Sequence, residues 1–159
     1  MKQSFLDYLK MVGVKEPLHK RIEGILQFYK ELCPEDITDI FVSEYLTQDG
    51  NREYSSVWFF SANYVMEAKY FIEKDDFDIM ALNQITYLEI EKKDYDFKQA
   101  KAESRMTAAY AAITNLVTGK LQSSQENCDV LKHILLEYLI PQVRGDGVFK
   151  NDTPSEKWM

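Results

Sequence analysis

Apolar and polar residues alternate in the middle of the chain. Between positions 64 and 72 every second residue is apolar or aromatic, and Glu67 and Lys69 lie between them. The residues on the apolar face are Tyr64, Met66, Ala68, Tyr70 and Ile72. Because the side chains of a β-strand point alternately to its two faces, this pattern predicts a strand with one face toward solvent.

β-forming residues recur on both sides of this strand, from Ser56 to Glu91. Asp49-Gly50 is a strong turn signal, and the polar residues 73–76 predict a loop. The middle third of the chain is therefore expected to be a sheet. Its further strands are predicted at residues 37–46, 57–60, 77–82 and 85–90, the last two being either separate strands or one bent strand.

A helix is predicted before the sheet. Over residues 18–32 an apolar residue recurs every three or four positions, which is the spacing of one face of an α-helix. The stripe consists of Leu18, Ile22, Ile25, Tyr29 and Leu32. Glu16-Pro17 suits the first turn of this helix, and Cys33-Pro34 ends the pattern. Because the stripe is one-sided, we expect the helix to lie on the sheet or on a partner.

Two more helices are predicted near the ends of the chain. Ser4 is a capping residue for a short N-terminal helix. A longer helix is predicted over residues 124–140, where Ser123 and Glu126 have the spacing of a capping box and Pro141 closes the pattern. Helices on both sides of a sheet predict an α+β fold.

The segment from Phe97 to Val117 fits two structures. Its alanine, lysine and glutamine residues favour a helix by intrinsic propensity. The alternative is a strand with Met106, Ala108, Tyr110 and Ala112 on one face, followed by a turn at Gly119 and a last strand containing Leu121. Propensity slightly favours the helix, but the tertiary context can override it.

The charge of the chain restricts its partners. The formal net charge is −7, and no cluster of basic residues stands out, since acidic residues surround Lys92 and Lys93. Such a surface repels phosphate backbones and anionic lipids, so we expect neither nucleic-acid nor membrane binding. The N-terminal residues do not resemble a signal peptide, and two isolated cysteines, Cys33 and Cys128, predict no disulfide framework. A cytoplasmic protein is expected.

Few residues carry catalytic or metal-binding signatures. The histidines, His19 and His133, lie on predicted helices, and no nucleophile motif accompanies them. Closely spaced zinc ligands do not occur, and the acidic residues 73–78 lack the central glycine of a calcium-binding loop. Thr118-Gly119-Lys120 has the end of a phosphate-binding loop, but the first glycine of that motif is replaced by Thr114. No cofactor is therefore expected.

Three consecutive aromatic residues, Trp58, Phe59 and Phe60, are a candidate floor for an aromatic ligand. Neighbouring residues of a strand point to opposite faces, so at least one of the three must be exposed or covered by a helix. Packing in the core is the preferred interpretation, because aromatic side chains dominate core burial.

The order of elements resembles that of bacterial pleckstrin-homology-like domains. The strands at 56–61, from Tyr64 and at 79–82, followed by residues 118–121 and a closing helix, are similar to that family over residues 37–140. The resemblance implies an antiparallel barrel closed by a C-terminal helix. Two features differ from the family. Its lipid-binding members carry basic residues in the first hairpin, whereas residues 48–53 contain one arginine among acids. Many members also have a tryptophan in the closing helix, and residues 124–140 contain none.

We expect an α+β protein with N-terminal helices, an antiparallel sheet that forms the barrel, and a C-terminal helix. If residues 97–117 are helical, the alternative is an open sheet with two C-terminal helices. The predicted parts are a helical segment at 1–34, a core at 35–142 and an extended tail at 143–159.

The expected function is that of a non-catalytic protein-interaction or scaffold module. A small-molecule-binding or hydrolytic protein is the alternative. Self-association is also expected, and its candidate interface is the helical stripe of Leu18, Ile22, Ile25, Tyr29 and Leu32.

Overall fold

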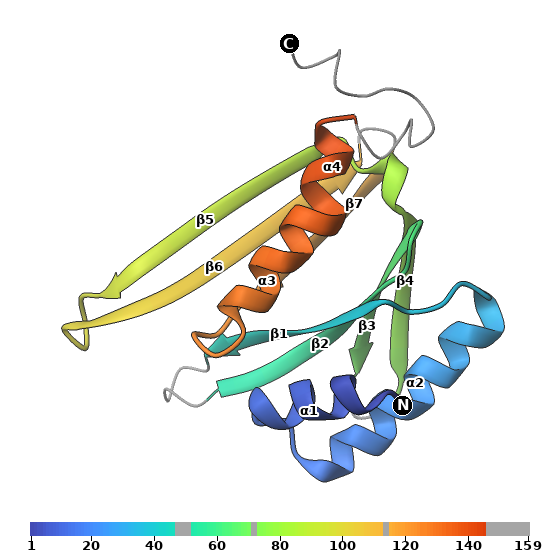
Figure 1. The fold of residues 1–159 in the computed structure, drawn as a ribbon, viewed down its shortest axis with the longest axis horizontal. Coiled ribbons are helices and arrows are strands. Elements are labelled where there is room, and N and C mark those ends of the chain that lie inside the picture. The colour runs from blue at the N-terminus through green and yellow to red at the C-terminus, as the bar shows by residue number, and fades with distance from the viewer. Residues whose placement is uncertain (47–51, 71–72, 113–114, 146–159) are drawn as a thin grey trace.

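Two antiparallel sheets with helices before and after them form the fold of the described residues (Figure 1). The computed structural model describes residues 1–46, 52–70, 73–112 and 115–145. The helices are α1 (Gln3–Met11), α2 (Glu16–Leu32), η1 (Leu82–Gln84), α3 (Cys128–Ile134), η2 (Leu135–Leu139) and α4 (Ile140–Val143). The strands are β1 (Asp39–Leu46), β2 (Arg52–Phe60), β3 (Tyr64–Tyr70), β4 (Asp75–Ala81), β5 (Tyr87–Asp96), β6 (Lys101–Ala112) and β7 (Asn115–Gln122). The fold is α+β, as predicted.

The strands pair with their neighbours in the sequence. One sheet has the order β1-β2-β3-β4 and the other the order β5-β6-β7. Where the two sheets meet, the Gln122 N–H donates to Ser43 Oγ at 3.0 Å. No hydrogen-bonded ladder joins the sheets within the described ranges, so the barrel implied by the resemblance is not closed there.

Helices α1 and α2 cover one face of the four-stranded sheet (Figure 1). Ile22, Ile25 and Tyr29 of α2 are buried in a core that includes Phe59 and Met66 of the sheet. The Tyr29 and Phe59 rings stack at 6.4 Å, and burial raises the pKa of Tyr29 to about 12. The predicted helix therefore forms, and its apolar stripe packs mainly on its own sheet.

A second core lies between the other face of that sheet, the three-stranded sheet and the C-terminal helix. Trp58 and Phe60 reach it from β2, and Leu131 and Ile134 reach it from α3. Since Phe59 points to the first core, the three consecutive aromatic residues serve two cores, and all three are fully buried. The expectation that they pack in the core is confirmed.

Strand β3 is buried on both faces, which differs from the predicted solvent-facing side. Val65 packs in the core between the sheets, whereas Met66 and Ala68 pack under the N-terminal helices. Glu67, expected in solvent, is only 8% exposed. The alternation correctly predicted the strand, but each face of this sheet is covered by a different layer.

Residues 101–112 form strand β6, so the preference for a helix was wrong. Met106, Ala108, Tyr110 and Ala112 are buried on one face of β6, as the alternative predicted. Gly119 lies within β7 opposite Tyr110 and not in a turn. The small alanines suit this position because they lie in the core that the C-terminal helix covers.

The C-terminal helix differs in detail from its prediction. It starts at Cys128, and its reciprocal capping pair is Ser124 with Asn127, whose side chains accept from each other's backbone N–H at 3.3 and 2.7 Å. The helix continues past Pro141 to Val143. Proline clashes with the carbonyl four residues earlier, and the wider π-helical turn η2 directly before it provides the space.

Other predictions have mixed outcomes. Helix α1 forms, but its N-cap is Lys2 and not Ser4. The acidic stretch at 73–78, predicted to begin as a loop, is mostly strand, since β4 starts at Asp75. The predicted turn at Asp49-Gly50 and the tail beyond residue 145 lie outside the described residues.

Candidate functional site

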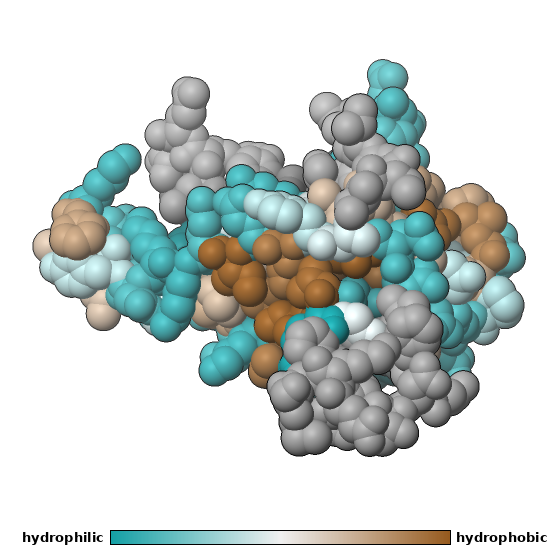
Figure 2. All heavy atoms as spheres, turned by 90° about the horizontal axis from the view of Figure 1, so that it is seen from above, coloured by the Kyte–Doolittle hydropathy of each residue, from teal (hydrophilic) through white to brown (hydrophobic). Residues whose placement is uncertain are grey.

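The hairpin of β5 and β6 projects beyond the rest of the molecule (Figures 1 and 2). Strand β7 ends at Gln122, which pairs with Thr107 of β6. From that point to the tip, β5 is the only strand among the described residues that pairs with β6. In the view of Figure 2, hydrophilic side chains follow the hairpin, and apolar atoms lie among them at its far end.

The tip of the hairpin is held by the side chain of Asp96. Its Oδ1 accepts the backbone N–H groups of Lys98 at 2.9 Å and of Gln99 at 3.1 Å. These hydrogen bonds, with that from Gln99 contributing most, hold the pKa of Asp96 below its usual value. Ala100 follows with a φ of 51°, in the left-handed region that closes the turn. The tip is therefore a structured turn.

This turn presents two aromatic side chains. Phe97 is 86% exposed and Tyr95 is 40% exposed. Their rings contact each other edge to face, with centroids 4.9 Å apart and planes at 68°. Among the large hydrophobic side chains of the described residues, Phe97 is the most exposed. Protein interfaces are enriched in aromatic residues.

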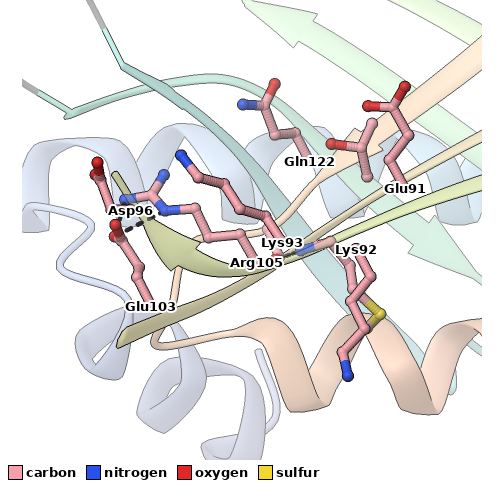
Figure 3. A pocket seen from close by; sticks show the side chains of 10 residues that line it. Glu91, Lys92, Lys93, Asp96, Glu103, Arg105 and Gln122 are labelled. Carbon is pink, nitrogen blue, oxygen red and sulfur yellow. Dashed lines mark hydrogen bonds and ion pairs between the residues drawn. The ribbon is translucent and has the colours of Figure 1, made fainter. Parts of the chain in front are cut away.

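A cavity of about 500 Å³ lies at the base of the projecting part (Figure 3). Arg105 is bonded to Glu103, with Nη2 and Nε at 2.7 and 2.8 Å from Oε1. Figure 3 shows Asp96 beside this pair, while Lys92 and Lys93 point in opposite directions. The carboxylates and cations that line the cavity balance in number, so it does not attract one sign of charge. The full lining is Glu91, Lys92, Lys93, Asp96, Glu103, Arg105, Met106, Thr107, Gln122 and Ser123.

The side chains of the two histidines contact a backbone carbonyl and a carboxylate, and neither contact is with a nucleophile. His19 Nε2 lies 2.7 Å from the carbonyl oxygen of Val14. His133 Nε2 lies 3.2 Å from Asp39 Oδ2, which also accepts a short hydrogen bond from Tyr138. Both cysteines are free thiols. Burial, together with the Asp39 hydrogen bond, raises the pKa of Tyr138. These contacts connect elements of the fold and do not form a nucleophile with its base.

The residues of the predicted helical interface are mostly inside the protein. Ile22, Ile25 and Tyr29 are buried, and Leu18 is half-buried. Leu32, at the end of α2, is 53% exposed. Self-association through this helix stays a prediction, and it would have to use Leu32 and the outer face of α2.

Sequence reasoning did not identify the hairpin tip. Residues 91–96 read as lysines among acids, and Phe97 as the start of a helix. One signal was present, because an aspartate side chain is suited to accept the backbone N–H about two residues further on in a turn. Asp96 followed by Phe97, Lys98 and Gln99 fits this pattern.

In the described part of the chain, no three His, Cys, Asp or Glu side chains gather into a metal-binding group. Among the same residues, no helix has the length and apolar character needed to cross a membrane. No protein-family model matches the sequence, and a search of curated proteins found no significant relative.

Proposed function

We propose that this protein is an interaction module that binds a protein partner through the tip of the β5–β6 hairpin. The observation that carries the proposal is the exposure of Phe97 on a turn fixed by Asp96. A side chain of this size gains roughly 1.5–3 kcal/mol when it is fully buried. Phe97 leaves most of that free energy unused in the isolated chain.

The rigidity of the tip supports the same proposal. An interface made by a preformed turn loses less conformational entropy on binding than one made by a flexible loop. Asp96 provides this order by bonding two successive backbone N–H groups beside Phe97. The ion pair of Arg105 with Glu103, which is largely shielded from solvent, orders two neighbouring side chains on one face of β6.

The likeness to pleckstrin-homology-like domains remains a proposal. Two antiparallel sheets with a C-terminal helix support it. The net charge of −7 argues against nucleic acid and anionic membranes as partners, which favours a protein partner. A small-molecule site is the second candidate, since the cavity of about 500 Å³ has the volume of a ligand pocket.

Site-specific photo-crosslinking in the native cells tests the proposed function. A benzophenone amino acid replaces Phe97 in one variant and Tyr87 in a control variant, because Tyr87 is also an exposed aromatic residue but lies at the other end of β5. We expect a discrete adduct of defined mass from position 97 and none from position 87. The adduct from a tagged chain should be lost when untagged wild type competes, and F97S should compete poorly.

Two results would contradict this function. Equal adducts from both positions would show non-specific contact, and no adduct from position 97 in any growth condition would remove the basis of the proposal. Because Phe97 is exposed, the free energy of unfolding of F97S is expected to lie within about 0.5 kcal/mol of the wild-type value. A loss of competition would therefore not reflect misfolding.

A further inference from the structure

A second concave surface lies between α1, the start of β1 and α3, away from the hairpin tip. It is a groove of about 350 Å³. Phe5, Ile40 and Val130 contribute apolar surface to it, and Asp39, Asp129 and His133 contribute polar groups. Its volume lies in the range of pockets that bind ligands or partner side chains.

The wall of the groove on the α1 side is fixed by buried hydrogen bonds. The Val42 N–H donates to the Tyr8 hydroxyl at 2.8 Å, which anchors α1 on β1. Asn127, fully buried, donates its side-chain N–H groups to Tyr8 at 3.2 Å and to the Val42 carbonyl at 3.0 Å. The same three residues thus connect α1, β1 and the residue before α3, so the groove is preformed.

The opposite side is fixed at the other end of α3. His133 and Tyr138 both bond to Asp39 Oδ2, which ties the C-terminal helix to the first residue of β1. Asp129, one turn before His133, is exposed and has no hydrogen bond or ion pair within the described residues. It is therefore the carboxylate of this groove that remains open to a partner's charge.

The charges of the groove have one sign. Its lining contains two carboxylates, Asp39 and Asp129, and no lysine or arginine. Lys2, which lies over the Phe5 ring at 5.3 Å, is held by the carbonyl of Ile37 at 2.8 Å. The net charge of the whole chain, −7, acts in the same direction. An apolar floor beside an open carboxylate complements a side chain that is apolar along its stem and cationic at its end, or an aliphatic residue next to a cation.

We propose that this groove binds a basic amphipathic segment of a protein partner. Its aliphatic side chains pack on Phe5, Ile40 and Val130, and a lysine or arginine pairs with Asp129. The proposal goes beyond the function assigned to the hairpin and does not depend on it, because the two surfaces share no residue.

Fluorescence anisotropy with synthetic peptides tests the groove. The probe is a labelled 14-residue helical peptide of leucine and lysine. One control peptide has glutamate in place of the lysines. The other control peptide has the same number of lysines but no leucine. We expect the full-length protein to bind the leucine–lysine peptide more tightly than either control. D129N should weaken binding on the order of fivefold, the size of one partly exposed ion pair.

Matched variants separate the groove from general attraction. The control for D129N is D94N, which removes one negative charge from the exposed hairpin. The control for V130R is V143R, which places an arginine on the C-terminal helix outside the groove. V130R should abolish binding, while D94N, V143R and F97S should leave it unchanged. Equal weakening by D129N and D94N, or by V130R and V143R, would overturn the proposal.

Amide chemical shifts of the wild-type protein provide a readout that needs no variant. On addition of the leucine–lysine peptide, we expect shifts at residues 4–8, at Ile40 and at residues 129–133. Shifts concentrated at residues 95–99, or spread evenly over the acidic surface, would overturn the assignment to this groove, as would the absence of binding.

Discussion

The ring of Tyr110 occupies the space where a side chain on Gly119 would lie. The two residues are directly opposite each other on β6 and β7, and a Cβ atom built on Gly119 would overlap the ring and hydroxyl of Tyr110. Tyr110 is buried in the core between the sheets, which together with nearby Glu67 raises its pKa. The glycine thus permits an aromatic ring to approach the backbone of the neighbouring strand closely.

Gly119→Ala is expected to destabilise the protein by about 1–3 kcal/mol, because the buried ring must move to accommodate the methyl group. Gly24→Ala is the matched control. Nothing lies within 4 Å of a Cβ on Gly24, which is inside α2, so alanine should stabilise by up to about 1 kcal/mol. Urea unfolding measures both. If G119A were as stable as wild type, Tyr110 would not pack as described.

The stripe of α2 should act in folding more than in association. Ile22→Ala is expected to reduce the free energy of unfolding by about 2–5 kcal/mol, because Ile22 is 2% exposed in the core under the sheet. Leu32→Ala should change it by no more than about 0.5 kcal/mol. Sedimentation of the wild type and L32A tests the predicted self-association. A monomeric wild type at high concentration would rule out that interface.

Glu67 is expected to destabilise the protein at neutral pH. Burial raises the pKa of Glu67. The charge of the nearby Lys69 and the hydrogen bond from Ser56 lower this pKa, but their combined effect is smaller than that of burial. A carboxyl whose pKa is higher in the folded state favours folding below its unfolded pKa, and this advantage is lost as the pH rises through the folded value. Glu67→Gln should therefore be more stable than wild type at pH 7.

The pH dependence of this difference is the check. Thermal unfolding of E67Q and wild type should differ at pH 7 and converge below the ordinary pKa of a glutamate, where both side chains are neutral. An advantage of E67Q that persisted at pH 3 would show that packing, and not the charge of Glu67, is responsible.

Asp96 should order the hairpin tip in a pH-dependent way. Its pKa is lowered by the bonds from Gln99 and Lys98, so its contribution is present above its unfolded pKa and is lost as the pH falls through the folded value. Asp96→Ala should loosen the turn at pH 7, seen as faster amide exchange at residues 98 and 99. Asp96→Asn retains an acceptor oxygen that does not titrate, so it should preserve the turn both at pH 7 and at a pH below the folded pKa of Asp96. Equal exchange in all three proteins would contradict the role of Asp96.

Local patterns determined much of the fold. The helix over residues 16–32 and the strand from Tyr64 formed where their periodicities predicted them, because one-sided apolar spacing is useful only in those conformations. The α+β class followed from the same patterns. The sequence also restricted the chemistry, since its histidines and cysteines carry no motif.

The strand at residues 101–112 was decided by its neighbours. Alanine favours a helix when a segment is considered alone. Here Ala108 and Ala112 lie between two other strands and beneath Leu131 and Ile134, where small side chains allow the C-terminal helix to approach the sheet. No local propensity contains that information.

The hairpin tip depended on tertiary structure for the same reason. Residues 91–96 are charged except for Tyr95 and read as solvent-exposed chain, and only pairing with β6 makes them a strand. That pairing carries Asp96, Phe97 and Tyr95 away from both cores, so the two aromatic rings stay outside. The sequence by itself determined which segments are amphipathic, whereas the tertiary structure decided which aromatic residues are buried, because burial depends on what packs against each face.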